Sequence, residues 1–323
     1  MEIEMQILKA LESIRTPILD TIMRGISFLG EETVFMVLAI VMFWCVDKWR
    51  GYYILSVGFV GTLCSQFMKL LFRVPRPWVR DSSFHTVDTP KKIGATGFSF
   101  PSGHTQGATG TFLSVGRDSK RVWLRIVCLI LPLLVGFSRM YLGAHYPSDV
   151  GVGLLMGVIL TVALHPILKK AKQSPIFMFG FLSVLILLCL GYLAYLLWAK
   201  FPPEVFIIEQ GSETSNYDDG LKNGYTLLGC VFGLLLSYAV DLKKLHFVEK
   251  APFWGQVCKV VLGLAGIMAI RFGLSMLFAS KILPIFADQF WWRAPRYFCM
   301  VVFAGAIWPM SFPLWQKVGA KKR

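Results

Sequence analysis

The sequence predicts an all-α fold, a polytopic transmembrane helical bundle with about nine spans. Of its 323 residues, 55% are hydrophobic and only 16% are charged, and the mean hydropathy is +0.59. The apolar residues come in runs of about 20, the length that a helix needs to cross about 30 Å of hydrocarbon. These values exclude a disordered chain and a water-soluble domain, and the seven cysteines stand singly in apolar surroundings, which predicts no disulfide framework.

Nine apolar runs predict the membrane spans. They lie at residues 30–46, 51–72, 103–116, 122–140, 148–168, 175–199, 224–241, 255–280 and 297–316. The third run is short and rich in Gly, Ser and Thr. It is counted as a span because the loops on its two sides can be sorted by charge only if it crosses.

The basic residues predict which loops face the cytoplasm. Lysine and arginine gather in alternate loops, at residues 48–50, 117–125, 169–172, 243–250 and 317–323. By the positive-inside rule these loops are cytoplasmic, so we expect the N-terminus outside and the C-terminus inside, in a bacterial cytoplasmic membrane. The outer loop 73–100 is also basic, which indicates that its cations have a purpose other than topology.

The net charge of +14 does not indicate a nucleic-acid partner. The basic residues are confined to short loops between apolar runs and form no continuous basic face. Composition instead divides the chain into three parts. Residues 1–29 form an amphipathic N-terminal segment outside the membrane, residues 30–172 contain the unusual polar side chains, and residues 173–323 are additional transmembrane helices.

Three cations are expected at the outer ends of the early spans. Lys69 and Arg76 lie in the stretch KLLFRVPRP, and Arg139 ends the fourth span. An arginine fork pairs bidentately with phosphate, and a lysine adds a compact positive charge. Lys69 alone could simply snorkel to the interface, but together the three cations predict a site for an anion with several oxygen atoms.

The start of the third span adds further donors to this predicted anion site. Pro101, Ser102, Gly103 and His104 open the run. Pro and Ser are ordinary helix-start residues. The amides of Ser102 and Gly103 would nevertheless point at an anion bound at the helix N-terminus, and glycine lets the backbone approach it closely.

Two histidines predict a two-step displacement at phosphorus. His145 is the expected nucleophile because Asp149, one helical turn later, could accept its other ring N–H and fix the tautomer. His104 is then the expected general acid and base. The cations already neutralise the developing charge, so the sequence predicts neither a metal site nor a cofactor.

These residues together resemble a known family. Lys69-x6-Arg76-Pro77, Pro101-Ser102-Gly103-His104 and Ser138-Arg139-x5-His145-x3-Asp149 are similar to the three signature motifs of the type 2 phosphatidic acid phosphatase (PAP2) superfamily. The resemblance covers about residues 50–165 and implies that residues 30–172 form a PAP2-like catalytic core. It also implies metal-independent hydrolysis through a phosphohistidine. The nine-span plan is similar to that of the glucose-6-phosphatase branch.

The predicted function is hydrolysis of a lipid phosphate or diphosphate monoester at the extracytoplasmic face. A lipid head group lies at the depth where the three motifs leave the membrane, which favours a lipid substrate. Three alternatives stay open: a lipid phosphotransferase, a phosphatase of soluble sugar phosphates, and a lipid transporter or binding protein. The oligomeric state also stays open.

A few residues outside the motifs receive separate interpretations. Arg271 lies within an apolar span, where it either pairs with another helix or contacts substrate. Gly153 and Gly157 have the spacing of close helix packing. The stretch 218–220, Asp-Asp-Gly, lacks the ligand spacing of a calcium loop and predicts a polar turn.

Overall fold

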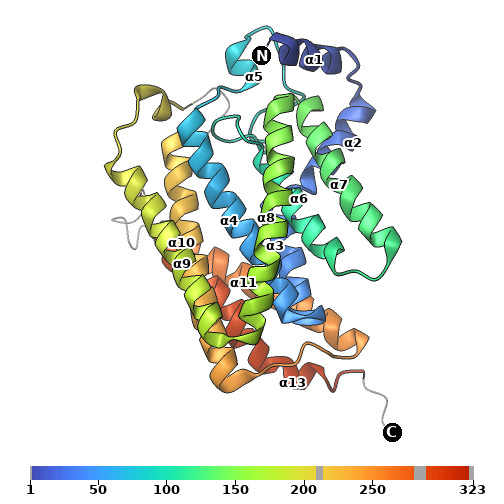
Figure 1. Ribbon diagram of the computed structural model, residues 1–323, viewed down its shortest axis with the longest axis vertical. Coiled ribbons are helices and arrows are strands. Elements are labelled where there is room, and N and C mark those ends of the chain that lie inside the picture. The colour runs from blue at the N-terminus through green and yellow to red at the C-terminus, as the bar shows by residue number, and fades with distance from the viewer. Residues whose placement is uncertain (1, 209–213, 280–288, 320–323) are drawn as a thin grey trace. The chain divides into compact units, whose positions relative to one another are not determined.

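The computed structural model describes residues 2–208, 214–279 and 289–319 (Figure 1). Within these ranges every regular element is a helix, which confirms the predicted all-α class. The helices are α1 (Glu2–Ser13), α2 (Pro17–Phe28), α3 (Glu32–Val41), α4 (Lys48–Phe72), α5 (Pro77–Arg80), α6 (Gly103–Arg117), α7 (Val122–Tyr141), α8 (Pro147–Gln173), α9 (Pro175–Trp198), α10 (Asn216–Val240), α11 (Phe253–Ala279), α12 (Arg293–Val302) and α13 (Phe312–Trp315). Short π-helical turns continue three of them, at Met42–Val46, Asp241–Leu245 and Phe303–Ile307.

Seven helices of the described chain are long and apolar enough to cross a membrane. An eighth span results if the bent pair Pro17–Phe28 and Glu32–Val46 counts as one. The predicted first run, 30–46, is the second arm of this pair. The predicted run 103–116 corresponds to α6, which has 15 residues with low mean hydropathy and does not reach the length of a span on its own. The count is therefore seven or eight where the sequence predicts about nine.

The chain divides into two compact units, which we call the first and the second unit. The first unit comprises Met1–Leu38, Tyr53–Ile167 and Ala199–Gly220, and the second comprises Ala39–Tyr52, Leu168–Trp198 and Leu221–Arg323. Each unit is described by itself below.

The first unit is built around α6, which packs closely against α7 and α8 (Figure 1). Its contact with α7 is apolar and includes the buried side chains of Phe112 and Val135. On the other side, a Cβ added at Gly153 of α8 would lie 2.8 Å from the carbonyl oxygen of Ser102. A Cβ added at Gly157 would lie 2.4 Å from Cβ of Thr109. The predicted packing role of both glycines is confirmed, because only residues without a side chain fit here.

The N-terminal helices of the first unit hold the basic loop at residues 73–100. Lys9 of α1 lies 2.7 Å from a carboxylate oxygen of Asp81, and Arg24 of α2 lies 2.9 Å from Asp88. Arg15, between the two helices, donates to the main-chain carbonyl of His85. The two carboxylates of this loop therefore fasten it to α1 and α2.

The second unit contains a buried cation that the sequence analysis did not single out. Lys259 of α11 is fully buried, and its ammonium donates to the main-chain carbonyls of Trp44 (2.8 Å) and Glu249 (2.6 Å). The same ammonium lies 4.3 Å from the centre of the Phe312 ring. Arg271, in the same helix, is exposed.

Candidate active site

The predicted site residues meet within the first unit, at the ends of its helices. Lys69 lies near the end of α4, Arg76 precedes α5, and Arg139 lies in the last turn of α7. The start of α6 is formed by Ser102, Gly103 and His104. His145 comes just before α8, and Asp149 lies in the first turn of that helix. Six of these eight residues are buried, while Gly103 and His104 are partly exposed.

The imidazole of His145 is held between a carboxylate and a guanidinium. Its Nδ1 lies 3.3 Å from Oδ2 of Asp149, and its Nε2 lies 3.0 Å from Nη1 of Arg76. Because guanidinium only donates and carboxylate only accepts, the ring carries its proton on Nδ1 and a lone pair on Nε2. Burial, followed by the positive charges of Arg76 and Arg139, lowers the pKa of His145 well below its usual value, so the ring is neutral.

Asp149 is fixed by its neighbours in the orientation that His145 needs. Its Oδ2 accepts hydrogen bonds from the hydroxyl of Ser99 (2.5 Å) and from the main-chain N–H of Tyr146 (2.9 Å). Its main-chain carbonyl accepts the N–H of Ser102 at 3.1 Å. This last bond ties the start of α8 to the start of α6.

The N-terminus of α6 is capped by Ser102. The hydroxyl oxygen of Ser102 accepts the main-chain N–H of Thr105, and the two hydroxyl groups lie 2.8 Å apart. This cap leaves the amides of Gly103 and His104 at the open end of the helix, where the helix dipole favours a negative charge.

All three cations donate to the loop at residues 93–97, which we call the carbonyl loop. Lys69 donates to the main-chain oxygen of Thr96 at 2.9 Å. Arg76 donates to the same oxygen at 2.6 Å and to that of Gly97 at 2.8 Å. These acceptors are neutral dipoles, so the positive charges of the two side chains are hydrogen-bonded by them but not neutralised.

Arg139 approaches the same loop from α7. Its Nη1 donates to the main-chain oxygen of Ile93 (2.5 Å) and to the hydroxyl of Ser27 (2.8 Å). Its Nη2 lies 3.4 Å from the carbonyl oxygen of Gly94. A Cβ added at Gly94 would lie 3.1 Å from ring atoms of His104, so His104 is beside the part of the loop that Arg139 contacts.

The two predicted catalytic histidines therefore lie beside the same three cations. The positive charges of Lys69, Arg76 and Arg139 act on both rings. An anion bound among these groups would be flanked by one neutral imidazole with an accessible lone pair and by a second imidazole able to exchange a proton.

Several groups at this site carry no signal that the sequence analysis could use. Ser27 and Ser99 contact Arg139 and Asp149 through hydroxyl groups, and serine is common in every context. The carbonyl loop acts through its main chain, which any residue supplies. Gly94 and Gly97 are the exception, since both adopt positive φ angles (61° and 67°) and a pair of nearby glycines in a loop could have indicated this.

Among the described residues, no group of three or more His, Cys, Asp or Glu side chains could hold a metal ion. The residues that converge are cations and imidazoles. Their arrangement fits a bound oxyanion.

Comparison with known proteins identifies the family. The model of the PAP2 superfamily matches residues 49–173, and the model described as the transmembrane extension of PAP2 superfamily phosphatases matches residues 225–320. The chain is 28% identical to phosphatidylglycerophosphatase B of Bacillus subtilis, over 51% of this chain and 83% of that protein. It is 31% identical to decaprenylphosphoryl-5-phosphoribose phosphatase of Mycobacterium tuberculosis, over 42% of this chain and 72% of that protein.

A third relative is a mammalian enzyme. The chain is 30% identical to the glucose-6-phosphatase catalytic subunit 1 of the dog, over 55% of this chain and 60% of that protein. The match thus spans less than two thirds of the length of this relative. With the family models and the three motifs, these similarities show that the chain belongs to the PAP2 superfamily and is a membrane phosphatase of the branch that carries the transmembrane extension.

Proposed function

We propose that this protein hydrolyses a phosphate or diphosphate monoester of a lipid through a phosphohistidine on His145, at the extracytoplasmic face of the membrane. The observation that carries the proposal is the orientation of the His145 ring. Its Nδ1 faces Asp149, and its Nε2 lone pair faces Arg76, the side chain best suited to hold a phosphate oxygen. The Nε2 lone pair of His145 therefore points toward the expected position of the phosphate before the substrate binds.

Substrate binding replaces main-chain carbonyls by phosphate oxygens. Lys69, Arg76 and Arg139 donate to the carbonyl loop. A phosphate carries more negative charge than a carbonyl dipole and forms shorter, stronger hydrogen bonds with the same donors. The amides of Gly103 and His104 at the start of α6 add two further donors.

Two displacements complete the reaction. In the first, Nε2 of His145 bonds to phosphorus, the bond from phosphorus to the leaving oxygen breaks, and His104, protonated when the anionic phosphate is bound beside it, transfers its extra proton to that oxygen. In the second, His104 takes a proton from water, the resulting oxygen bonds to phosphorus, and the bond to Nε2 breaks. Inorganic phosphate leaves and both imidazoles return to their first state, with Asp149 holding the Nδ1 proton throughout.

The lipid part of the proposal is supported by the relatives and by the place of the site. The names of the Bacillus and Mycobacterium relatives refer to lipid phosphates. The site is formed by the ends of membrane-spanning helices, the level at which a lipid head group lies. The extracytoplasmic orientation follows from the distribution of lysine and arginine between the loops.

A soluble sugar phosphate is a second candidate substrate. It is favoured by the similarity to glucose-6-phosphatase, which extends over more of this chain than the match to the Mycobacterium enzyme. The same clamp and the same two histidines would serve, since only the group beyond the leaving oxygen differs.

Phosphate release by the purified full-length protein tests both candidates. We expect release in the presence of a chelator, because the cations supply the positive charge, and we expect it from at least one of phosphatidate, a prenyl diphosphate or a sphingoid phosphate. Release from a sugar phosphate alone would favour the second candidate. Rapid quenching in denaturant at alkaline pH, where a phosphohistidine survives, should leave phosphate from radiolabelled substrate on His145, and label in the wild type that persists in His145→Ala would overturn the mechanism.

A further inference from the structure

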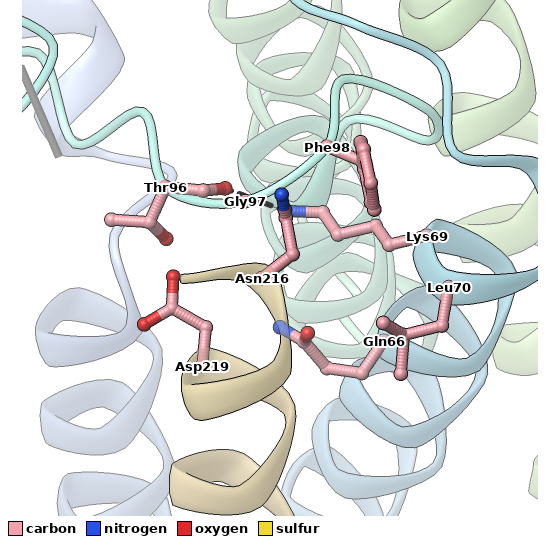
Figure 2. Close-up of a pocket in the computed structure, with 8 residues that line it drawn as sticks. All are labelled: Gln66, Lys69, Leu70, Thr96, Gly97, Phe98, Asn216 and Asp219. Carbon is pink, nitrogen blue, oxygen red and sulfur yellow. Dashed lines mark hydrogen bonds between the residues drawn. The ribbon is translucent and has the colours of Figure 1, made fainter. Parts of the chain in front are cut away.

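A narrow crevice, too tight in this structure to hold a water molecule, lies beside Lys69, on the edge of the cluster of cations; we call it the pocket (Figure 2). It is lined by Gln66 and Lys69 of α4, by the end of the carbonyl loop, and by Asn216 and Asp219 in the first turn of α10. All of these residues belong to the first unit. Asn216 and Asp219 lie between the two stretches that the family models match, so neither model assigns them a role.

Asn216 presents a buried acceptor that has no donor. Its side chain is 6% exposed, and its Oδ1 has no hydrogen-bond partner within the described chain. The same atom lies 3.2 Å from the position that a Cβ on Gly97 would take, which places it against the lining of the pocket. A buried carbonyl oxygen without a donor is costly in a folded protein, and such atoms are uncommon. It is satisfied if a ligand brings an O–H or N–H group to it.

Asp219 adds a second acceptor on the same helical turn. Its Oδ1 accepts the hydroxyl of Thr214 at 2.6 Å, and its negative charge acts on the ammonium of Lys69. It lies in the first turn of α10. Figure 2 shows Asn216 and Asp219 on α10, across the pocket from Gln66 and Lys69 on α4.

The sequence predicts a polar turn for the stretch that contains Asp219, and this prediction is wrong. Asp218, Asp219 and Gly220 lie in the first turns of a 25-residue helix. Asp218 serves the helix start, since it exchanges hydrogen bonds with Ser215. Asp219 is thereby left facing the pocket.

The pocket has opposite character on its two sides. Lys69 attracts the phosphate of a substrate, whereas the acceptors of Asn216 and Asp219 repel a second phosphate and accept a hydrogen from a hydroxyl group. A hydroxyl on the second carbon from the phosphorylated oxygen is close to the phosphate and carries the donor that Oδ1 of Asn216 lacks.

Resting on the proposed function, we propose that Asn216 and Asp219 form a specificity subsite for a hydroxyl group next to the phosphate. The substrate is then the phosphomonoester of a polyol, a glycerol-like or sugar-like head group, in preference to a simple alkyl or prenyl phosphate. We call this the hydroxyl subsite.

One pair of substrates tests the hydroxyl subsite directly. We compare dodecyl phosphate with 2-hydroxydodecyl phosphate, which carries one hydroxyl on the second carbon from the phosphorylated oxygen. For the wild type we expect kcat/KM to be about tenfold higher for the hydroxylated ester, as for one buried hydrogen bond to a polar or charged acceptor. In Asn216→Ala and in Asp219→Asn this ratio should fall toward one.

Asp218→Asn is the matched control. This substitution removes one negative charge from the same helical turn, but Asp218 does not line the pocket. The ratio of kcat/KM between the two esters should therefore stay at its wild-type value. Asn216→Ala and Asp219→Asn test the subsite independently if either one fails to fold. A wild-type ratio near one, or variants that lose activity equally on both esters, would overturn the proposal, since the second outcome means that these residues only position Lys69.

The test also separates this inference from the proposed function. Turnover of both esters at equal kcat/KM would disprove the hydroxyl subsite and leave the phosphatase proposal intact. Turnover of neither ester would disprove the phosphatase proposal for such substrates. In that case the shift in melting temperature gives the affinity of each ester: about tenfold tighter binding of the hydroxylated ester, lost in Asn216→Ala, supports the subsite. Equal affinities overturn it.

Discussion

Buried cations occur in both units, but their acceptors differ. In the second unit, Lys259 donates to the carbonyls of Trp44 and Glu249, residues far apart in the sequence, and lies against an aromatic ring. In the first unit, Lys69 donates to the carbonyl of Thr96, beside Arg76, which donates to the carbonyls of Thr96, Gly97 and Ala144. A cation such as Lys259, whose donors are divided between two distant segments, holds those segments together. Lys69 can instead exchange its carbonyl in the loop for an anion, and the place of the acceptors thus distinguishes Lys259 from Lys69.

The largest expected effect is at the nucleophile. His145→Ala should reduce phosphate release on the order of 10⁴-fold or more, because no other side chain of the site offers a neutral nitrogen in this position. Initial rates with saturating substrate measure this. His165→Ala is the matched control, since His165 is a partly exposed histidine of the same unit that lies near Asp118. Wild-type rates for His145→Ala would disprove the assignment.

The general acid should come next. His104→Ala should lower kcat at least about 10²-fold on an alkyl ester, the usual contribution of general acid–base catalysis. The loss should be much smaller in the first step for a nitrophenyl ester, whose leaving group needs no proton. A burst of nitrophenol before steady state would show this difference. An equal loss with both leaving groups would indicate that His104 only shapes the site.

A pair of lysine substitutions tests the comparison itself. Lys69→Met should lower kcat/KM by about 10–100-fold, the value of one hydrogen bond to a charged group, and should leave the melting temperature nearly unchanged. Lys259→Met should lower the melting temperature and leave kcat/KM nearly unchanged, within about twofold of wild type. It removes the Lys259 donor from the carbonyls of Trp44 and Glu249, of which the second keeps the side chain of Gln256, at a cost of about 1–3 kcal/mol. If both variants lose activity equally, the distinction between the two kinds of cation is wrong.

The smallest expected effect concerns pH. The pKa of His145 in the folded protein is well below 6.5, its ordinary value. The unfolded chain therefore binds this proton more readily, and stability present above about pH 6.5 is lost as the pH falls further. The melting temperature should drop on going from about pH 7.5 to about pH 5.5, and His145→Gln should drop less. An equal drop in both proteins would show that His145 does not contribute.

Much of the fold and of the site could be predicted from the sequence. Long apolar runs identified the helices from α7 to α11, because a span must be apolar along its whole length. The span predicted at 103–116 is not confirmed, because α6 is too short to cross the membrane on its own. Many of its polar side chains, such as Thr105 and Gln106, are buried by neighbouring helices. Hydropathy alone cannot distinguish such a helix from a true span.

The motif residues could be predicted because cations and histidines are uncommon beside apolar runs. Examples are Lys69, Arg76 and His145. The acceptors that hold them could not be predicted, since main-chain carbonyls have no signature in the sequence. Asn216 was also missed, because its role depends on a contact with residues more than a hundred positions earlier in the chain.

The absence of a side chain at Gly153 lets α8 approach α6 closely. The carbonyl that a methyl group would strike belongs to Ser102, whose own N–H is bonded to the carbonyl of Asp149. A single added carbon would push α8 away from α6. The proposed nucleophile, His145, comes just before α8, and the proposed acid, His104, lies on α6. The proposed mechanism thus depends on interhelical clearance at a residue that touches no reacting atom.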